Sequence, residues 1–208
     1  MLLIRPANRA TRTVCLVAVD KPARLPTQRG HEGDTLNGMN KAELTWIESA
    51  GGPLILLEEH LLSHWHGIDT DDYDRACGID DYLGLLDVGS GRALVLGEEP
   101  MRTAWQPLSG PAEGMLVRWQ WADDDESVVE AIADLSKVSW EATGIVFDLT
   151  DNSLVLFDAA CPGADPDCNT TGCKLNIVLK EKRYLIETAH HTPDENTALF
   201  LHRFVIRG

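Results

Sequence analysis

The sequence predicts an α+β protein that is mostly antiparallel sheet built from hairpins, with about two helices. Short apolar runs recur along the chain, and turns rich in glycine, proline and asparagine separate them, which is typical of strands joined by tight turns. Only two segments repeat their apolar residues at helical spacing instead. At 208 residues, the chain is long enough for one domain with a sizeable core.

The first 38 residues are expected to lie outside that domain. They alternate arginine, proline, glycine and threonine, with no regular period beyond a short apolar run at residues 13–19. Such a composition buries too little apolar surface to offset the entropy of ordering, so we expect a disordered extension over residues 1–38. A translation start assigned too early, with Met39 as the true start, is the alternative. The single domain then spans residues 39–208.

The first two strands are expected on either side of a tight turn. Apolar runs that begin at Trp46 and at Leu54 flank the sequence Ala-Gly-Gly-Pro at residues 50–53. Glycine reaches positive φ at little steric cost and proline fixes its own φ, so this sequence favours a turn. The segment therefore predicts strand, turn and strand.

Two helices are expected, each opened by acidic residues that complement the helix dipole. The first begins at Glu58 and Glu59, and Gly67 ends it. Its apolar side consists of Leu61, Leu62 and Trp65. The second follows the acidic run at residues 123–126 and places Val128, Ala131, Ile132 and Leu135 on one side.

The remaining strands are expected in pairs around short turns. The expected hairpins join residues 82–88 to 92–97, residue 105 to 115–121, and 144–150 to 153–157. The chain closes with three antiparallel strands at residues 174–179, 183–189 and 197–206.

The charge of the chain is strongly negative and unevenly spread. The net charge is −15, of which residues 1–38 contribute +3 and residues 39–208 contribute −18. So acidic a surface repels phosphate backbones and attracts basic partners, at association rates that fall as salt rises. The composition therefore argues against a nucleic-acid ligand and favours a basic protein partner.

Much of this charge falls between residues 69 and 81. Six aspartates lie here, with Arg75 as the only basic residue: Asp69, Asp71, Asp72, Asp74, Asp80 and Asp81. Composition alone leaves a solvated loop and a partner-binding surface equally open. A calcium loop is a poorer fit, because Tyr73 interrupts the required spacing of oxygen ligands and Ala76 supplies none.

Three histidines form the sharpest enzymatic candidate. His60 and His64 are four residues apart on the first expected helix, a spacing at which two imidazoles can reach one zinc ion, and His66 could add a third. The glutamate that follows the first histidine in zinc proteases is replaced by Leu61. Surface histidines on an amphipathic helix are the simpler interpretation, so no metal or cofactor is expected.

Cysteine usage and hydropathy bear on the compartment. Five cysteines, an odd number, with no secretion signal, indicate free thiols in a reducing compartment. No apolar run approaches the length of a membrane span. We therefore expect a cytoplasmic protein that does not contact a membrane.

Several motifs together resemble the immunity protein 21 family of bacterial polymorphic toxin systems. The most specific is W-x-E-S-x-G-G-P-L, which contains Trp46, Glu48, Gly51, Gly52 and Pro53. The others lie at residues 72–77, 82–84, 94–100 and 197–203. The resemblance covers about residues 44–206, whereas residues 168–173 and the amino-terminal extension depart from the family pattern.

The resemblance implies a protein without enzymatic activity that binds a cognate toxin domain and blocks it. The acidic charge agrees, because a nuclease toxin presents a basic cleft to its substrate. Asp69, Asp71, Asp72, Asp74, Asp80 and Asp81 are then the expected contact surface. Two alternatives stay open: a metal-dependent enzyme that uses His60, His64 and His66, and an acidic adaptor protein without a toxin.

Overall fold

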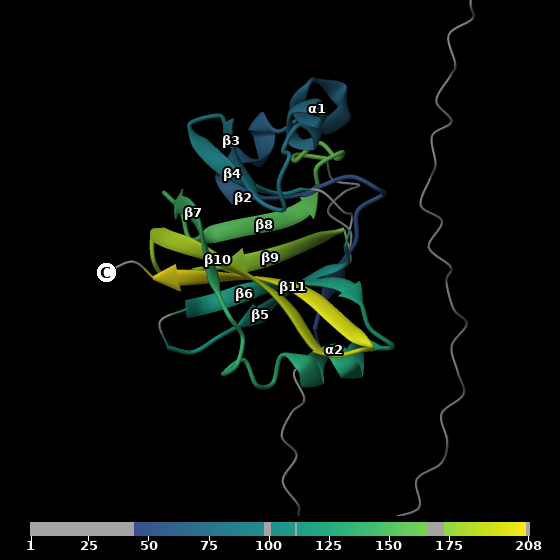
Figure 1. The fold of residues 1–208 in the computed structure, drawn as a ribbon. Helices are drawn as coiled ribbons and strands as arrows, with labels where there is room; N and C mark the ends of the chain where they lie inside the picture. The colour runs from purple at the N-terminus through teal and green to yellow at the C-terminus, as the bar shows by residue number, and fades with distance from the viewer. Residues whose placement is uncertain (1–43, 98–100, 111, 166–172, 207–208) are drawn as a thin grey trace, which may run out of the picture. The chain divides into compact units, whose positions relative to one another are not determined.

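The computed structural model describes residues 44–97, 101–110, 112–165 and 173–206 (Figure 1). All of them belong to one compact unit, Lys41–Gly208. The extension expected at residues 1–38 lies outside the described residues. Among the helices that are described, none has the length and apolar character needed to cross a membrane.

The described residues form two antiparallel sheets. The six-stranded sheet has the order β1-β5-β6-β11-β10-β7 and the five-stranded sheet has the order β3-β4-β2-β8-β9. The six-stranded sheet contains β1 (Trp46–Ile47), β5 (Thr103–Pro107), β6 (Ala112–Trp121), β7 (Glu141–Asp148), β10 (Arg183–Asp194) and β11 (Thr197–Ile206). The five-stranded sheet contains β2 (Leu54–Glu58), β3 (Gly84–Val88), β4 (Gly91–Leu96), β8 (Ser153–Asp158) and β9 (Lys174–Val178).

The two sheets pack face to face, and helical segments cover parts of both outer faces (Figure 1). Strand β2 explains why the sequence there is continuously apolar. Leu54 and Leu56 face the core between the sheets, whereas Ile55 and Leu57 belong to a second core on the outer face of the five-stranded sheet. A strand that is buried on both faces needs no polar alternation.

The outer core of the five-stranded sheet is closed by short helical elements. These are the 3₁₀ helices η1 (Glu59–His64) and η2 (Gly67–Asp69) and the α-helix α1 (Asp72–Cys77). Leu61, Trp65 and Ala76 are all buried against this face. On the other sheet, α2 (Asp125–Ala131) places Val128 and Ala131 against β6 and β11.

Several sequence-based predictions are confirmed. Strands β3 and β4 form the expected hairpin, with Leu86 opposite Ala93, and β5 pairs with β6 as expected. Strands β10 and β11 also pair. Helix α2 forms where expected, with the Asp124 side chain accepting a hydrogen bond from Ser127 N at 2.8 Å, although it ends at Ala131 rather than continuing to residue 135.

The predictions that the other neighbouring strands pair with each other are wrong. Strand β7 pairs with β10 in one sheet, and β8 pairs with β2 and β9 in the other, so the turn at residues 149–152 connects the two sheets. Likewise β9 pairs with β8 and not with β10. The strands on either side of the turn at residues 50–53 also belong to different sheets. Turn sequence predicts a reversal of the chain, but it does not say whether the next strand joins the same sheet.

Two helical predictions also need correction. The expected helix at residues 58–67 is a 3₁₀ helix that ends at His64, and Trp65 has extended backbone angles. Residues 69–81, for which a solvated loop was one of two interpretations, begin at the end of η2 and contain α1. With these short helices, the α+β fold is largely β.

Candidate functional site

The acidic segment, Asp69–Asp81, is fixed to the outer face of the five-stranded sheet just beyond Trp65. The indole Nε1 of Trp65 donates a hydrogen bond to Ala159 O at 2.9 Å, and the side chain is 1% exposed. Next to it, Gly67 has φ +56, and a Cβ atom there would lie 2.4 Å from Ala160 O. The sequence therefore needs glycine at this position, because a side chain here would collide with the backbone of Ala160 and Cys161, just after β8.

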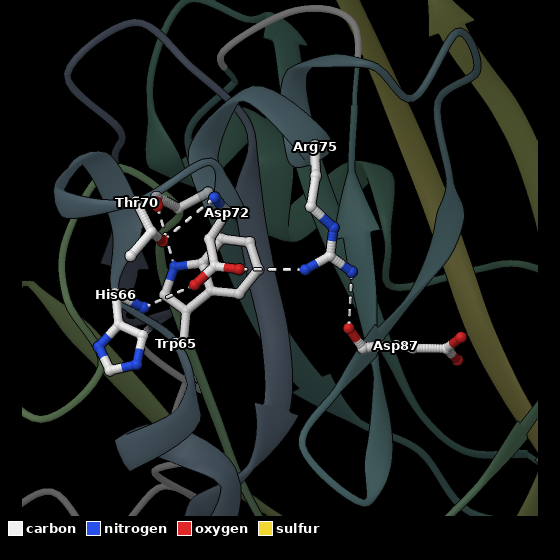
Figure 2. A network of polar contacts seen from close by, with 7 residues as sticks. Trp65, His66, Thr70, Asp72, Arg75 and Asp87 are labelled. Carbon is white, nitrogen blue, oxygen red and sulfur yellow. Dashed lines mark hydrogen bonds and ion pairs between the residues drawn. The ribbon is translucent and has the colours of Figure 1, made fainter.

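Asp72 holds this segment together from inside (Figure 2). Its two carboxylate oxygens accept hydrogen bonds from His66 N at 2.9 Å and from Arg75 Nη1 at 3.1 Å. The other end of the Arg75 guanidinium donates to Asp87 O at 2.8 Å. Because Asp87 lies on β3, this chain of bonds ties α1 to the edge of the sheet.

The other five aspartates of the segment are exposed. They are Asp69, Asp71, Asp74, Asp80 and Asp81. Among the residues that the structure describes, none of the five has an ion-pair partner. The structure thus separates one structural aspartate from five carboxylates that are available to a partner.

An exposed apolar side chain, that of Ile68, directly precedes these aspartates in the sequence. Ile68 is 66% exposed, although isoleucine is usually buried. It belongs to η2, directly before Asp69. Ile68 was not among the contact residues predicted from the sequence, where its only signal is an isolated isoleucine at the start of an acidic run. We call Ile68 together with Asp69, Asp71, Asp74, Asp80 and Asp81 the acidic surface.

The turn at residues 50–53 packs against α1. Gly51 has φ +122, and Ser49 Oγ donates to Gly52 O at 2.6 Å. A Cβ atom on Gly52 would lie 2.3 Å from the hydroxyl of Tyr73, so α1 packs directly on this glycine. Pro53 is buried, and its carbonyl accepts a hydrogen bond from Ala159 N at 3.0 Å. The motif residues are therefore structural here.

The same motif also reaches the six-stranded sheet. The rings of Trp46 and Trp119 meet edge to face with centroids 5.4 Å apart, and the Arg102 guanidinium lies over both rings. Glu48 forms an ion pair with Arg102 at 2.8 Å. Trp46 and Glu48 thus help to hold β1 and β6 together.

Tyr73 is held by neighbours that favour its neutral form. A hydrogen bond with the Cys77 side chain raises the pKa of Tyr73, and burial and the negative charges nearby add to the effect. Tyr73 acts as a packing residue between Gly52 and α1.

The histidines do not have the geometry that the sequence suggested. His60 and His64 lie on a 3₁₀ helix, where residues four apart point about 120° away from each other, against about 40° in an α-helix. His66 lies beyond the end of η1. In the described part of the chain, no three histidine, cysteine, aspartate or glutamate side chains are grouped as metal ligands would be.

Comparison with known proteins adds one finding. A family model described as immunity protein 21 matches residues 45–197. No curated protein and no solved structure matches the chain. The matched range includes the turn at residues 50–53 and the whole acidic segment.

Proposed function

The chain belongs to the immunity protein 21 family, and from this premise we propose that it binds the toxin domain of a polymorphic toxin system and neutralises it. Neutralisation by binding needs no catalytic group in this chain. It needs a surface that covers the toxin's own site and that forms the complex before damage is done.

The observation that carries the placement is the acidic surface. Among the described residues, five exposed carboxylates without ion-pair partners follow, within 13 positions of the chain, an apolar side chain that is 66% exposed. Protein interfaces commonly place an apolar contact at the centre and polar residues at the rim. We propose that Ile68 is the central contact and that the aspartates meet basic residues of the toxin.

Charge supports a basic toxin, and a nuclease in particular. Residues 39–208 carry a net charge of −18. A nuclease must attract a phosphate backbone, so its active site is lined by lysine and arginine. An acidic inhibitor is steered towards such a site by long-range attraction, which speeds association at low salt.

Neither alternative function gains an observation of its own. The enzyme hypothesis required His60 and His64 on one helical face, and η1 turns them apart. The adaptor hypothesis involves no toxin, whereas membership of the immunity protein 21 family favours a toxin partner.

The test is a pull-down with the tagged full chain from native cells at 50 mM and 500 mM salt, with bound proteins identified by mass. We expect a basic toxin-like domain at low salt and less of it at high salt. The recovered domain is then expressed in a sensitive host with and without this protein. Survival only with this protein supports the proposal, whereas death in both cultures, or recovery of no such domain, contradicts it.

A further inference from the structure

A groove of about 940 Å³ opens between the two sheets at the edge formed by β3 and β7. These are the outermost strands of their sheets on this side. Its lining includes Leu85 of β3, Ala142 and Ile145 of β7, and Thr188 of β10. The volume lies in the range of sites that hold a small ligand or a large side chain.

One wall of the groove is aromatic. The ring of Phe200 stacks between Tyr82, at a centroid distance of 4.3 Å, and His190, at 4.7 Å. His190 is held in place because its Nε2 lies 2.8 Å from Gln120 Oε1. Because Tyr82 and His190 cover the faces of Phe200, the wall offers ring edges, against which another aromatic side chain can pack edge to face.

The deepest part of the lining contains an unsatisfied polar atom. His202 is fully buried, and its Nε2 has no hydrogen-bond partner among the described residues. The hydroxyl of Thr188 lies 2.9 Å from His202 Nδ1 and 3.3 Å from Leu201 O, so Nδ1 has a partner and Nε2 is the atom left without one. Leaving a buried polar atom unpaired costs about 1–3 kcal/mol, which a hydroxyl group brought in by an occupant would recover, because a hydroxyl can donate or accept.

Charge decides which donors the groove tolerates. Burial, with the nearby charge of Arg118, lowers the pKa of His202 well below its usual value. The same positive charge disfavours a cation at that depth, so the donor there is neutral. At the mouth, by contrast, the carboxylates of Asp81 and Glu141 have no ion-pair partner within the described part of the chain.

The basic residue that lines the groove does not neutralise this mouth. The Arg92 guanidinium is bound to Asp148 at 3.3 Å and to Val146 O at 3.4 Å. Asp81 lines the groove and is also part of the acidic surface, so the groove and the acidic surface adjoin each other at this residue. A partner attracted by the acidic surface therefore meets the groove next.

We propose that this groove is the anchor pocket of the toxin interface, which takes a tyrosine side chain from a basic segment of the toxin. The ring packs against Leu85 and Ile145, the hydroxyl approaches His202 Nε2, and flanking lysine or arginine residues meet Asp81 and Glu141. The inference rests on the proposed function, because it takes the toxin to be the partner. Aromatic anchors in pockets contribute a large share of the affinity of many interfaces.

A pair of tryptophan substitutions tests the groove. Glu141 lies opposite Thr188 on the face that lines the groove, so Glu141→Trp fills the groove from an exposed position on β7, and the fold should tolerate the change. Glu195→Trp is the matched control, since it also replaces an exposed carboxylate and lies in the turn between β10 and β11, outside the groove lining. The unfolding midpoint in urea of both variants should match that of the wild type.

The first probe is the blocked peptide Lys-Lys-Tyr-Lys-Lys, titrated into the full chain and followed by NMR. We expect saturable shifts at the amides of Ala142 and Thr188. Binding should be at least five-fold weaker for the peptides with alanine for tyrosine or glutamate for lysine, and it should be lost in Glu141→Trp only. No shift at these amides, or equal binding by Glu141→Trp, would overturn the inference.

The second probe is the toxin domain recovered in the pull-down. Glu141→Trp should bind it at least ten-fold more weakly than the wild type and protect cells poorly, whereas Glu195→Trp should match the wild type. If the wild type protects and Glu141→Trp protects equally well, this inference fails and the proposed function stands. If the wild type itself binds no toxin, the proposed function fails and this inference fails with it.

Discussion

The carboxylate of Asp72 lies 3.1 Å from the guanidinium of Arg75, one turn further along α1, and both side chains are directed towards the sheet (Figure 2). Asp72 is 8% exposed, while Asp71 and Asp74 on either side of it are exposed to solvent. Aspartates close together in the sequence therefore differ in structural role. Asp72 orders the acidic segment, and its neighbours carry the charge that a partner would meet.

Asp72→Ala should destabilise the protein by about 1–3 kcal/mol, because His66 N and the Arg75 guanidinium lose their acceptor. Asp71→Ala is the control, since Asp71 is exposed and makes no capping hydrogen bond with its side chain. Its effect should stay within about 0.5 kcal/mol. Urea unfolding of both variants measures the difference, and equal losses would show that the Asp72 network adds no stability.

Reversing the charge at Asp69, Asp71 and Asp74 together, by substitution with lysine, should weaken toxin binding about ten-fold or more at low salt. Most of this difference should disappear at 500 mM salt, where exposed charges are screened. Asp72 is left intact so that the fold is preserved. The measurement is the association rate and Kd at several salt concentrations.

The matched control for charge reversal changes three exposed carboxylates elsewhere to lysine, namely Asp123, Glu130 and Glu195. The net charge of the protein is then the same in both variants. If the control weakens binding as much as the reversal at the acidic surface, general attraction explains the effect, and the acidic surface is not the contact.

Glu58→Gln should lower the free energy of unfolding by about 2 kcal/mol. The Glu58 carboxylate is 1% exposed and accepts hydrogen bonds from Thr150 N at 2.6 Å, from Thr150 Oγ1 at 2.9 Å and from Asp151 N. It thus fixes the turn where the chain crosses from one sheet to the other. Glu59→Gln, at an exposed neighbour, should change the urea midpoint little, and a similar loss there would refute this explanation.

His202 should make the stability of the protein depend on pH below about 6.5. Burial lowers its pKa in the folded state, so the unfolded chain takes up a proton first as the pH falls. The stability due to neutral His202 is complete above the unfolded pKa and is lost as pH falls below it. Between pH 7.5 and 5.5 this loss should be on the order of 1 kcal/mol.

The comparison for this pH dependence is His202→Gln, which removes the titrating group. The stability of the wild type should fall by on the order of 1 kcal/mol more than that of the variant between the two pH values. His60→Gln, at an exposed position, should retain the full slope of the wild type. Parallel curves for the wild type and His202→Gln would contradict the prediction.

Local sequence was sufficient where neighbours in the chain are also neighbours in the sheet. The β3–β4 hairpin follows from its Gly-Ser-Gly turn, and α2 follows from its N-cap and the spacing of Val128 and Ala131. It was insufficient at the turn of residues 149–152, because the partner that fixes that turn is Glu58, more than 90 residues away. The groove could not be predicted from the sequence either, because Ala142 and His202 come together only through the pairing of β7, β10 and β11.

The sequence by itself determined the positions of most strands, the acidic charge of residues 39–208 and the resemblance to the immunity protein 21 family. Each of these follows from residue order alone: apolar period, turn residues, a sum of charges and a set of motifs. The tertiary structure decided which strands share a sheet, that Asp72 is buried while Asp71 and Asp74 are exposed, and that His60 and His64 point apart. These depend on contacts between segments distant in sequence, whose packing energy overrides local preference.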